Sequence, residues 1–379
     1  KAFGEFVEAN AETPHISAAD LATKTANGED IIVLDSRPFN EYHNMNIPNG
    51  IDVPGAELAY RIHDLAPNPE TTVVVNCAGR TRSIIGAQSL INAGVPNPVV
   101  ALENGTMGWH LAGLELERGQ RRNFNEVSPD ALVVAEKRAA MVRDRFEVPV
   151  TDHAQVDTWR KDPTRTTYLL DVRDPAEFQQ AHLPGSKSSP GGQLVQATDL
   201  YVGVRRARLV LIDDTGVRAS MSASWLIQMG WHDVHVLYGI SALFTESGSQ
   251  QQQISNLNQQ PIEYISAEKL RDALEGPEKV HVADLATSLQ YRDQGHIPGA
   301  WFTVRSHMPE NLSFANESEL IVLTSPDGQL AALAFEDATE GGLKVKVLEG
   351  GTAAWTALGE SLEHGFTQMA DETTDVWYK

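Results

Sequence analysis

Short apolar runs alternate with amphipathic segments through the first part of the chain. Residues 31–34, 72–75 and 99–102 are almost wholly apolar, as expected of strands that are buried on both faces of a sheet. Residues 83–93 instead place apolar side chains three and four positions apart, which is the spacing of a helix, and Gly94 favours its end. Strands that alternate with helices predict an α/β fold with a mainly parallel central sheet flanked by helices.

The same pattern returns further along the chain. Residues 34–94 match residues 170–230 at one constant spacing and without a gap. The matched pairs include Leu34 with Leu170, Asp35 with Asp171, Arg37 with Arg173, Glu41 with Glu177, and Arg82 with Arg218. Agreement over so long a segment indicates tandem domains of one fold.

A third and more diverged copy occupies the C-terminal part of the chain. It repeats residues 16–18 as residues 265–267, and residues 102–106 as residues 348–352. We therefore predict three tandem domains, each long enough for a core of its own. The predicted parts are a linker or remnant of an upstream domain (1–12), a catalytic domain (13–120), a helical linker (121–146), an inactive domain (147–246), a glutamine-rich linker (247–261) and a second inactive domain (262–379).

Composition places the chain among ordinary globular proteins. Of its 379 residues, 41% are hydrophobic and 21% are charged, which is typical of folded soluble domains. No stretch approaches the roughly 20 apolar residues that cross a bilayer. The formal net charge of −21 repels the phosphates of nucleic acids and anionic membranes. We therefore expect neither nucleic acid nor membrane among the partners.

The single cysteine, Cys77, limits the chemistry further. It excludes an intrachain disulfide and a zinc site built from several cysteines of this chain. A lone cysteine fits a reducing compartment, so we expect a cytoplasmic protein without a metal or other cofactor. Residues 1–10 lack the apolar core of a secretory signal. Because the chain begins at Lys1 rather than methionine, a preceding targeting segment or domain stays open.

The segment around Cys77 is the most informative one for function. Cys77 lies where a predicted buried strand ends, and the predicted helix begins at Ser83. Ligands of open α/β sheets bind beyond the carboxyl ends of the strands, and backbone amides at a helix start favour an anion. The same setting stabilises a thiolate. Arg80 and Arg82 add positive charge, and we expect Gly79 to provide the tight curvature or positive φ of an amide cradle.

Cys77 also has a simpler interpretation. A free cysteine is among the most frequently buried residue types, and a thiol at a strand end is commonly inert packing. Two arginines and a glycine within the next few residues are unusual neighbours for such a thiol. This environment favours a reactive cysteine.

The three copies resemble rhodanese homology domains over nearly the whole chain from about Pro14. The motifs that carry the resemblance are Leu34-Asp35-Ser36-Arg37 with Glu41-Tyr42, the turns His182-Leu183-Pro184-Gly185 and Gly295-His296-Ile297-Pro298-Gly299-Ala300, the closing segment Leu102-Glu103-Asn104-Gly105-Thr106 with Trp109, and the loop from Cys77 to Arg82. Each motif alone is weak evidence, but together they are specific.

The resemblance implies a thiosulfate sulfurtransferase that works by double displacement. The Cys77 thiolate would attack the outer sulfur of a donor such as thiosulfate, release sulfite and become a persulfide. Cyanide, a small thiol or a protein acceptor would then take the sulfur. The substrate-binding residues implied are Ala78, Gly79, Arg80, Thr81, Arg82 and Ser83. Thiosulfate and 3-mercaptopyruvate both stay open as donors, although the arginines favour an inorganic dianion.

The second and third copies depart from the loop pattern in ways that predict inactivity. Asp213 replaces Cys77 in the second copy, and a carboxylate cannot carry a persulfide, although Arg218 is kept. Ser325 and Leu330 replace the cysteine and the arginine in the third copy. Only the first domain is therefore expected to be catalytic.

Several other motif residues are expected to serve the fold. The first copy's turn, residues 45–50, lacks the histidine found as His182 and His296 in the other two. We expect those histidines to be structural rather than metal ligands. We likewise expect Asp35 and Arg37 to form an ion pair that holds the strand ends.

Two other functions stay open. Phosphatases and arsenate reductases of the Cdc25-like branch share this fold, but their Cys-x5-Arg loop wraps a tetrahedral oxyanion. Here Arg82 gives a Cys-x4-Arg spacing, which suits a single sulfur atom better than a phosphate. The second alternative is a sulfur-relay or scaffold protein in which the inactive domains bind a partner.

Overall fold

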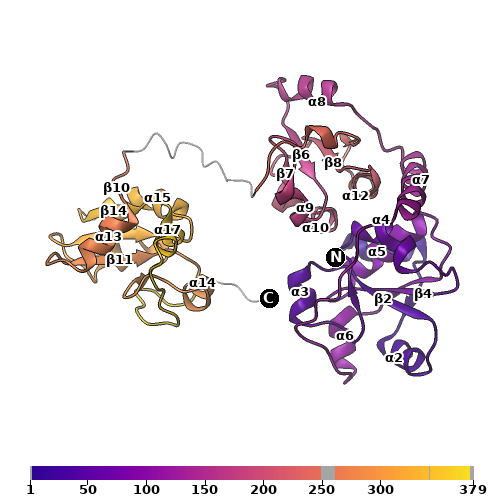
Figure 1. The fold of residues 1–379 in the computed structure, drawn as a ribbon, viewed down its shortest axis with the longest axis horizontal. Coiled ribbons are helices and arrows are strands. Elements are labelled where there is room, and N and C mark those ends of the chain that lie inside the picture. Colours follow the sequence, from indigo (N-terminus) through magenta and orange to yellow (C-terminus); the bar gives the residue numbers. More distant parts are fainter. Residues whose placement is uncertain (1, 249–260, 341, 376–379) are drawn as a thin grey trace. The chain divides into compact units, whose positions relative to one another are not determined.

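The computed structural model describes residues 2–248, 261–340 and 342–375 (Figure 1). The chain divides into two compact units, residues 1–250 and residues 251–379. The first two repeats share the first unit, and the third repeat forms the second. Most of the predicted glutamine-rich linker, residues 249–260, lies outside the described residues.

Repeat one contains a five-stranded sheet in the order β1-β5-β4-β2-β3, in which all paired strands are parallel. Its elements are α1 (Ala2–Ala11), β1 (His15–Ile16), α2 (Ala18–Ala26), β2 (Ile31–Asp35), α3 (Phe39–Asn44), β3 (Ile51–Asp52), α4 (Glu57–Leu65), β4 (Thr72–Asn76), α5 (Thr81–Asn92), β5 (Val99–Leu102) and α6 (Gly105–Leu111).

The strands predicted from the apolar runs correspond to β2, β4 and β5. The helix predicted from Ser83 begins earlier, at Thr81. The apolar spacing starts only at Ile84, and the first turn of a helix needs no apolar face, so the periodicity missed it. As a result, Thr81 and Arg82 belong to the first turn of α5 rather than to the loop.

Repeat two has a four-stranded parallel sheet in the order β7-β6-β8-β9. Its elements are α8 (His153–Arg160), β6 (Thr167–Asp171), α9 (Pro175–Gln180), β7 (Lys187–Ser188), α10 (Gly191–Gln196), α11 (Thr198–Tyr201), β8 (Arg208–Ile212), α12 (Val217–Gln228), β9 (Val234–Leu237) and the 3-10 turn η1 (Ser241–Leu243).

Repeat three has a five-stranded parallel sheet in the order β10-β14-β13-β11-β12. Its elements are β10 (Tyr264–Ile265), α13 (Ala267–Leu274), β11 (Val280–Asp284), α14 (Ser288–Asp293), β12 (Trp301–Phe302), η3 (Arg305–His307), η4 (Glu310–Leu312), β13 (Leu320–Thr324), α15 (Gln329–Leu333), α16 (Phe335–Thr339), β14 (Lys344–Leu348) and α17 (Gly351–Ala357). The predicted fold class, three parallel-sheet α/β units flanked by helices, is confirmed.

Helix α7 (Pro129–Arg145) joins repeats one and two and packs against both (Figure 1). Its hydroxyl cap is Ser128, which accepts a hydrogen bond from the amide of Ala131 at 3.2 Å. Ala135 and Ala139 of α7 lie in one buried cluster with Tyr60 of α4 and Val217 of α12. The predicted helical linker is thus a structural part of the first unit.

Buried ion pairs hold the strand ends of repeats one and two, as expected. The guanidinium of Arg37 contacts both carboxylate oxygens of Asp35, at 2.8 and 2.7 Å. Arg173 pairs with Asp171 in the same way. In repeat three, the corresponding Asp284 is also buried, and it accepts a hydrogen bond from the amide of Ala286 at 2.8 Å.

The motif histidines are buried against aromatic rings. His182 stacks on Phe178 with ring centroids 3.7 Å apart, and its Nδ1 contacts the Phe178 carbonyl oxygen at 2.7 Å. His296 stacks on Tyr291 at 3.5 Å. Asn46 takes this place in repeat one, where its amide donates to Ile47 and Glu117. The geometry is that of residues that support a turn.

Candidate functional site

Cys77 follows the last residue of β4 at the carboxyl end of the sheet. The register of the strands gives the same place to Asp213 after β8 and to Ser325 after β13, because the preceding residues pair with Asp171 and Asp284 as Asn76 pairs with Asp35. The alignment of the three loops made from the sequence is therefore correct in the structure.

The thiol itself is buried, with 1% of the Cys77 surface exposed. Burial alone does not separate a reactive thiol from an inert one, so its surroundings decide. The first amides of a helix have no intrahelical partner and carry positive character. Helix α5 begins at Thr81, only a short loop after Cys77, and its first amides can therefore serve a negatively charged sulfur.

A second helix, α6, is hydrogen-bonded to the cysteine loop through its first residues. The carbonyl oxygen of Cys77 accepts a hydrogen bond from the amide of Thr106 at 2.8 Å, and that of Ala78 accepts one from Met107 at 3.0 Å. Gly105, which precedes them, has φ +53°, and a Cβ there would lie 2.2 Å from the Cys77 carbonyl oxygen. The closing motif of the repeat is therefore a clamp on the cysteine loop.

The positive φ predicted for Gly79 is not found, whereas the tight curvature predicted there is, because the chain bends at residues 78–80. Gly79 is absent from the described glycines with positive φ, and a Cβ built on it meets nothing within 4 Å. The close approach and the positive φ occur at Gly105 instead. That contact joins two segments far apart in the chain, and local sequence does not indicate which glycine makes it.

Both arginines of the loop are paired with carboxylates. Arg82 donates two hydrogen bonds to Glu41 of α3, at 2.8 and 2.7 Å. Arg80 forms an ion pair with Glu8 of α1. Burial lowers the pKa of Arg82, but Glu41 and the nearby charge of Cys77 outweigh it, so the pKa lies above its ordinary value. The guanidinium of Arg82 is therefore charged and held in place beside the cysteine.

Sequence reasoning noted Glu41 as a motif residue but assigned neither Glu41 nor Glu8 to the site. A signal for the first existed in the repeat itself, because Glu41 and Arg82 recur together as Glu177 and Arg218. For Glu8 there was none. Residues 1–12 were expected to be a linker or the remnant of an upstream domain. In the structure, α1 packs on α5 so closely that a Cβ at Gly4 would lie 2.6 Å from a Thr81 methyl carbon.

Polar contacts fix the strand ends around the loop. The Asn76 amide donates to Asp35 at 2.8 Å and to the Thr106 hydroxyl at 2.9 Å. Ser36 donates its hydroxyl hydrogen to the Asn76 carbonyl oxygen at 2.8 Å. Ser83, which is buried, donates to the Arg80 carbonyl oxygen at 2.8 Å. The predicted site residues thus lie together in one tightly bonded loop and first helical turn.

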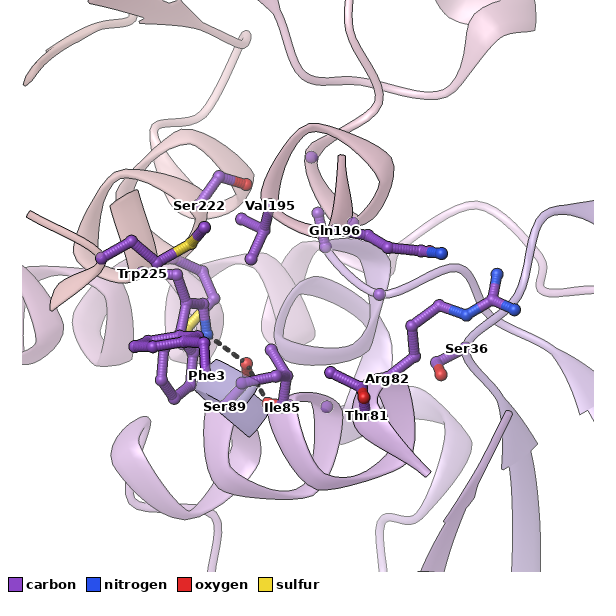
Figure 2. A pocket seen from close by; sticks show the side chains of 17 residues that line it. Phe3, Ser36, Thr81, Arg82, Ile85, Ser89, Val195, Gln196, Ser222 and Trp225 are labelled. Carbon is purple, nitrogen blue, oxygen red and sulfur yellow. Dashed lines mark hydrogen bonds between the residues drawn. The ribbon is translucent and has the colours of Figure 1, made fainter. Parts of the chain in front are cut away.

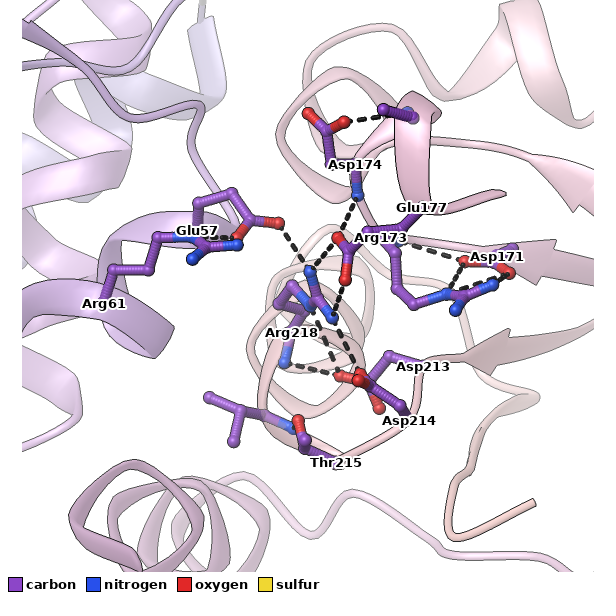
Figure 3. Close-up of polar contacts among 12 residues, drawn as sticks. Glu57, Arg61, Asp171, Arg173, Asp174, Glu177, Asp213, Asp214, Thr215 and Arg218 are labelled. Carbon is purple, nitrogen blue, oxygen red and sulfur yellow. Dashed lines mark hydrogen bonds and ion pairs between the residues drawn. The ribbon is translucent and has the colours of Figure 1, made fainter. Parts of the chain in front are cut away.

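Repeat two shows what this loop holds when its first residue is an acid (Figure 3). The Asp213 carboxylate accepts hydrogen bonds from the amides of Gly216, of Arg218 at 2.8 Å and of Ala219 at 3.2 Å. Burial raises the pKa of Asp213 to about 6, although the charge of Arg218 opposes the shift. In repeat three, the hydroxyl of Ser325 accepts one such hydrogen bond, from Ala331 at 3.3 Å. The backbone amides of the loop and first helical turn thus donate hydrogen bonds to an acceptor on the first residue.

The spacing of the repeats gives the matching amides in repeat one as those of Arg80, Arg82 and Ser83. These are three of the six positions that the sequence assigned to substrate binding. The arrangement can hold a negatively charged sulfur on Cys77 without any metal ligand.

Arg218, the counterpart of Arg82, makes a contact between the two repeats (Figure 3). It is fully buried and donates to Glu57 of repeat one at 2.9 Å and to Asp214 at 2.7 Å, and it also pairs with Glu177. Charges from both repeats meet at this guanidinium. It binds the two repeats together.

Comparison with known proteins agrees with this architecture. The model of the rhodanese-like domain matches residues 17–112, 152–243 and 266–358, which together make up most of the chain. The protein therefore belongs to the rhodanese-like domain family.

A crystal structure of a thiosulfate sulfurtransferase from Pseudomonas aeruginosa is similar to the whole chain. The two share 48% sequence identity with a TM-score of 0.93, over 100% of this chain and 71% of that one. A rhodanese-like domain protein from Staphylococcus aureus matches 25% of this chain and 91% of its own, at 26% identity and a TM-score of 0.23.

Among curated proteins, an HTH-type transcriptional regulator of Mycobacterium tuberculosis is 32% identical over 104 residues. The match covers 27% of this chain and 45% of the regulator, so the chain spans less than half the length of that relative.

Within residues 2–248, 261–340 and 342–375, no helix is both long and apolar enough to cross a membrane. The same described residues bring together no group of three or more His, Cys, Asp or Glu side chains that could hold a metal ion.

Proposed function

We propose that the protein is a sulfurtransferase that moves sulfane sulfur from thiosulfate to cyanide or a thiol through a persulfide on Cys77. The observation that carries the proposal is the loop of repeat two, where an ionisable side chain on the first residue accepts three backbone amides. The same loop in repeat one places a cysteine at that position. The likeness of the whole chain to a thiosulfate sulfurtransferase supports the same reaction.

The first step is attack by the Cys77 thiolate on the outer sulfur of thiosulfate. A bond forms between Sγ and that sulfur, the sulfur–sulfur bond of thiosulfate breaks, and sulfite leaves with its electron pair. The amides of Arg80, Arg82 and Ser83 stabilise the persulfide anion that remains. This is covalent catalysis by an activated nucleophile.

The second step returns the enzyme to its starting state. Cyanide or a thiolate attacks the outer sulfur of the persulfide, and the electron pair of the broken bond goes back to Cys77. The product is thiocyanate or an acceptor persulfide. Arg82, fixed by Glu41 at the edge of the loop, supplies the positive charge that attracts both anionic substrates.

The other repeats lack a group for this chemistry. Asp213 already fills its loop with a carboxylate, and Ser325 offers a hydroxyl that does not ionise at neutral pH. We therefore assign the reaction to repeat one alone. A reducing compartment such as the cytoplasm would suit a single reactive thiol.

The test is the intact mass of the full chain after incubation with thiosulfate. The wild type is expected to gain one sulfur atom and to lose it again when cyanide is added, while Cys77→Ser gains nothing. The exposed Val133→Phe variant serves as a folded control with Cys77 intact. A wild type that neither gains sulfur nor releases sulfite would exclude thiosulfate as the donor.

A further inference from the structure

An apolar cavity of about 120 Å³ lies between repeats one and two, within the first unit (Figure 2). Repeat one contributes Ile85 of α5, and repeat two contributes Val195, Met221 and Trp225 of α10 and α12. Phe3 of α1 closes the same end as Trp225, its ring 6.0 Å from the tryptophan ring and edge-on to it. The walls are thus mainly apolar side chains, which favour an apolar ligand.

The cavity extends to the first turn of α5, which follows the cysteine loop. Figure 2 shows Arg82, Ser36 and Gln196 at the end opposite Trp225. Arg82 lies in the first turn of α5, directly after the loop, and the Ser36 hydroxyl donates to the Asn76 carbonyl oxygen immediately before Cys77. A molecule in the cavity therefore lies next to Arg82, whose backbone amide is one of the three assigned to the sulfur.

The interface between the two repeats has approximate two-fold symmetry. A Cβ on Gly55 would lie 3.1 Å from the Cα of Gly192, and in the matching pair a Cβ on Gly191 would lie 2.7 Å from the Cβ of Ala56. Trp225 donates to Ser89, its own counterpart in repeat one, at 2.8 Å. Each repeat therefore presents the same face to the other, and two related positions exist for a cavity.

The position beside Arg218 is filled. The guanidinium of Arg218 is fully buried, lies 4.5 Å from the ring centroid of Tyr60 and bonds Glu57. Tyr60 corresponds to Gln196 on the other side. A tyrosine thus occupies the space next to the inactive loop, while the shorter, polar glutamine leaves space next to the catalytic one.

We infer that this cavity holds the organic part of a small thiol acceptor, of about the size of a phenyl group. The inference rests on the proposed function. An engineered apolar cavity of about 150 Å³ holds benzene, and this cavity is slightly smaller. Arg82 at its loop end favours the thiolate, and the apolar end favours the carbon body.

The reaction of such an acceptor is balanced without another reagent. Its thiolate forms a bond to the outer sulfur of the Cys77 persulfide, the bond from that sulfur to Sγ breaks, and Cys77 recovers the electron pair. The product is the organic persulfide of the acceptor.

The experiment measures how fast an acceptor removes the sulfur from Cys77 in a single turnover. The full-length protein is loaded with thiosulfate and freed of excess donor, and the loss of one sulfur is timed by intact mass. The acceptors are cyanide, 2-mercaptoethanol and phenylmethanethiol. We expect phenylmethanethiol to unload the wild type about tenfold or more faster than 2-mercaptoethanol at equal thiolate concentration, because each apolar group in a fitted pocket changes discrimination by about that factor.

Variants of Val195, which lies in repeat two and outside the catalytic loop, test the cavity itself. Val195→Phe fills the space and is expected to remove the preference for phenylmethanethiol while the cyanide rate stays within about twofold. Val133→Phe makes the same change at an exposed position of α7 (65% exposed) and should alter neither rate. Val195→Ala enlarges the cavity and is expected to admit naphthylmethanethiol, which keeps the test decisive if the phenylalanine variant does not fold.

The outcomes separate the inference from the proposed function. Two outcomes refute the acceptor site and leave sulfurtransfer standing. In the first, cyanide unloads the wild type but phenylmethanethiol is no faster than 2-mercaptoethanol. In the second, phenylmethanethiol stays faster in Val195→Phe and neither Val195 variant changes which size of thiol reacts faster. If thiosulfate never loads the wild type, the proposed function fails and the inference falls with it.

Discussion

Arg218 offers the most direct test of how the first two repeats are held together. Its buried guanidinium binds Glu57 of repeat one and pairs with Glu177 and Asp214 of repeat two. Arg218→Leu gives repeat two the residue that repeat three has at this position, Leu330. It leaves the carboxylates of both repeats without their shared cation.

The expected loss of stability is large because buried carboxylates would lose their cationic partner. Removing one member of a buried ion pair costs about 3–5 kcal/mol, so we expect the free energy of opening of the first unit to fall by about that amount near neutral pH. Arg218 also lowers the pKa of Asp213, which burial raises to about 6. Without Arg218 the pKa of Asp213 rises further, and its ionised form becomes more costly in the folded state.

The sign of the pH dependence follows from that shift. A carboxyl whose pKa is higher in the folded state than in the unfolded state destabilises the fold once it ionises, and the cost is absent when the pH is below both values. The part of the Arg218→Leu deficit that comes from Asp213 should therefore be absent below the Asp213 pKa of about 6 and should grow as the pH rises above it.

Hydrogen exchange of peptides from β8 and α12 in the full chain measures this opening free energy locally. Arg205→Leu is the matched control, because Arg205 belongs to the same repeat and is exposed. A change of less than about 1 kcal/mol, the range of ordinary surface substitutions, would refute the reasoning. A deficit equal on both sides of pH 6 would refute its electrostatic part.

Three further predictions address the loops. Gly105→Ala should lower the steady-state rate of sulfur transfer from thiosulfate to cyanide by about 100-fold, because its Cβ would collide with the Cys77 carbonyl oxygen and displacing a catalytic group by about 1 Å has roughly that cost. Gly79→Ala is the control. Nothing lies near its Cβ, so it should change the same rate by less than twofold. Asp284→Asn should stabilise repeat three above pH 7 and have no effect below pH 4, since burial raises the pKa of Asp284 to about 7 from 3.8. Hydrogen exchange of β11 and β13 measures this gain in stability, and a gain that does not depend on pH would contradict the prediction. Asp213→Cys in a Cys77→Ser background should gain no sulfur from thiosulfate by intact mass, because Arg218, Glu57 and Tyr60 close that loop; a mass gain would show that the loop is open.

The fold was largely predictable because its signals are local. A strand buried on both faces must be an apolar run, and the repeat showed such runs in the same order more than once. The cysteine loop was located for a similar reason, since a strand end followed by a helix places Cys77 at the edge of the sheet where ligands bind. Hydrophobic pattern and chain order are sufficient for these conclusions.

The missing parts of the site depend on contacts between distant segments. Arg80 pairs with Glu8, and Gly105 touches the Cys77 carbonyl oxygen. Nothing in the composition of either segment indicates which one it will meet. The same holds for Glu57 and Arg218, whose contact arises only when two separately predictable sheets pack on each other.

Packing of the repeats also explains why the loop of repeat two, which has no cysteine, keeps its shape. The first amides of α12 need an acceptor, and Asp213 supplies one from within the chain. The loop of repeat two therefore stays ordered without a ligand, and Arg218 at its edge is free to bind Glu57 across the interface. In repeat one, the corresponding amides have Cys77 before them, and a persulfide anion would supply the acceptor that a carboxylate supplies in repeat two. The same hydrogen-bonding requirement thus yields a rigid support in one repeat and, under the proposed function, a site in the other that a bound sulfur would complete.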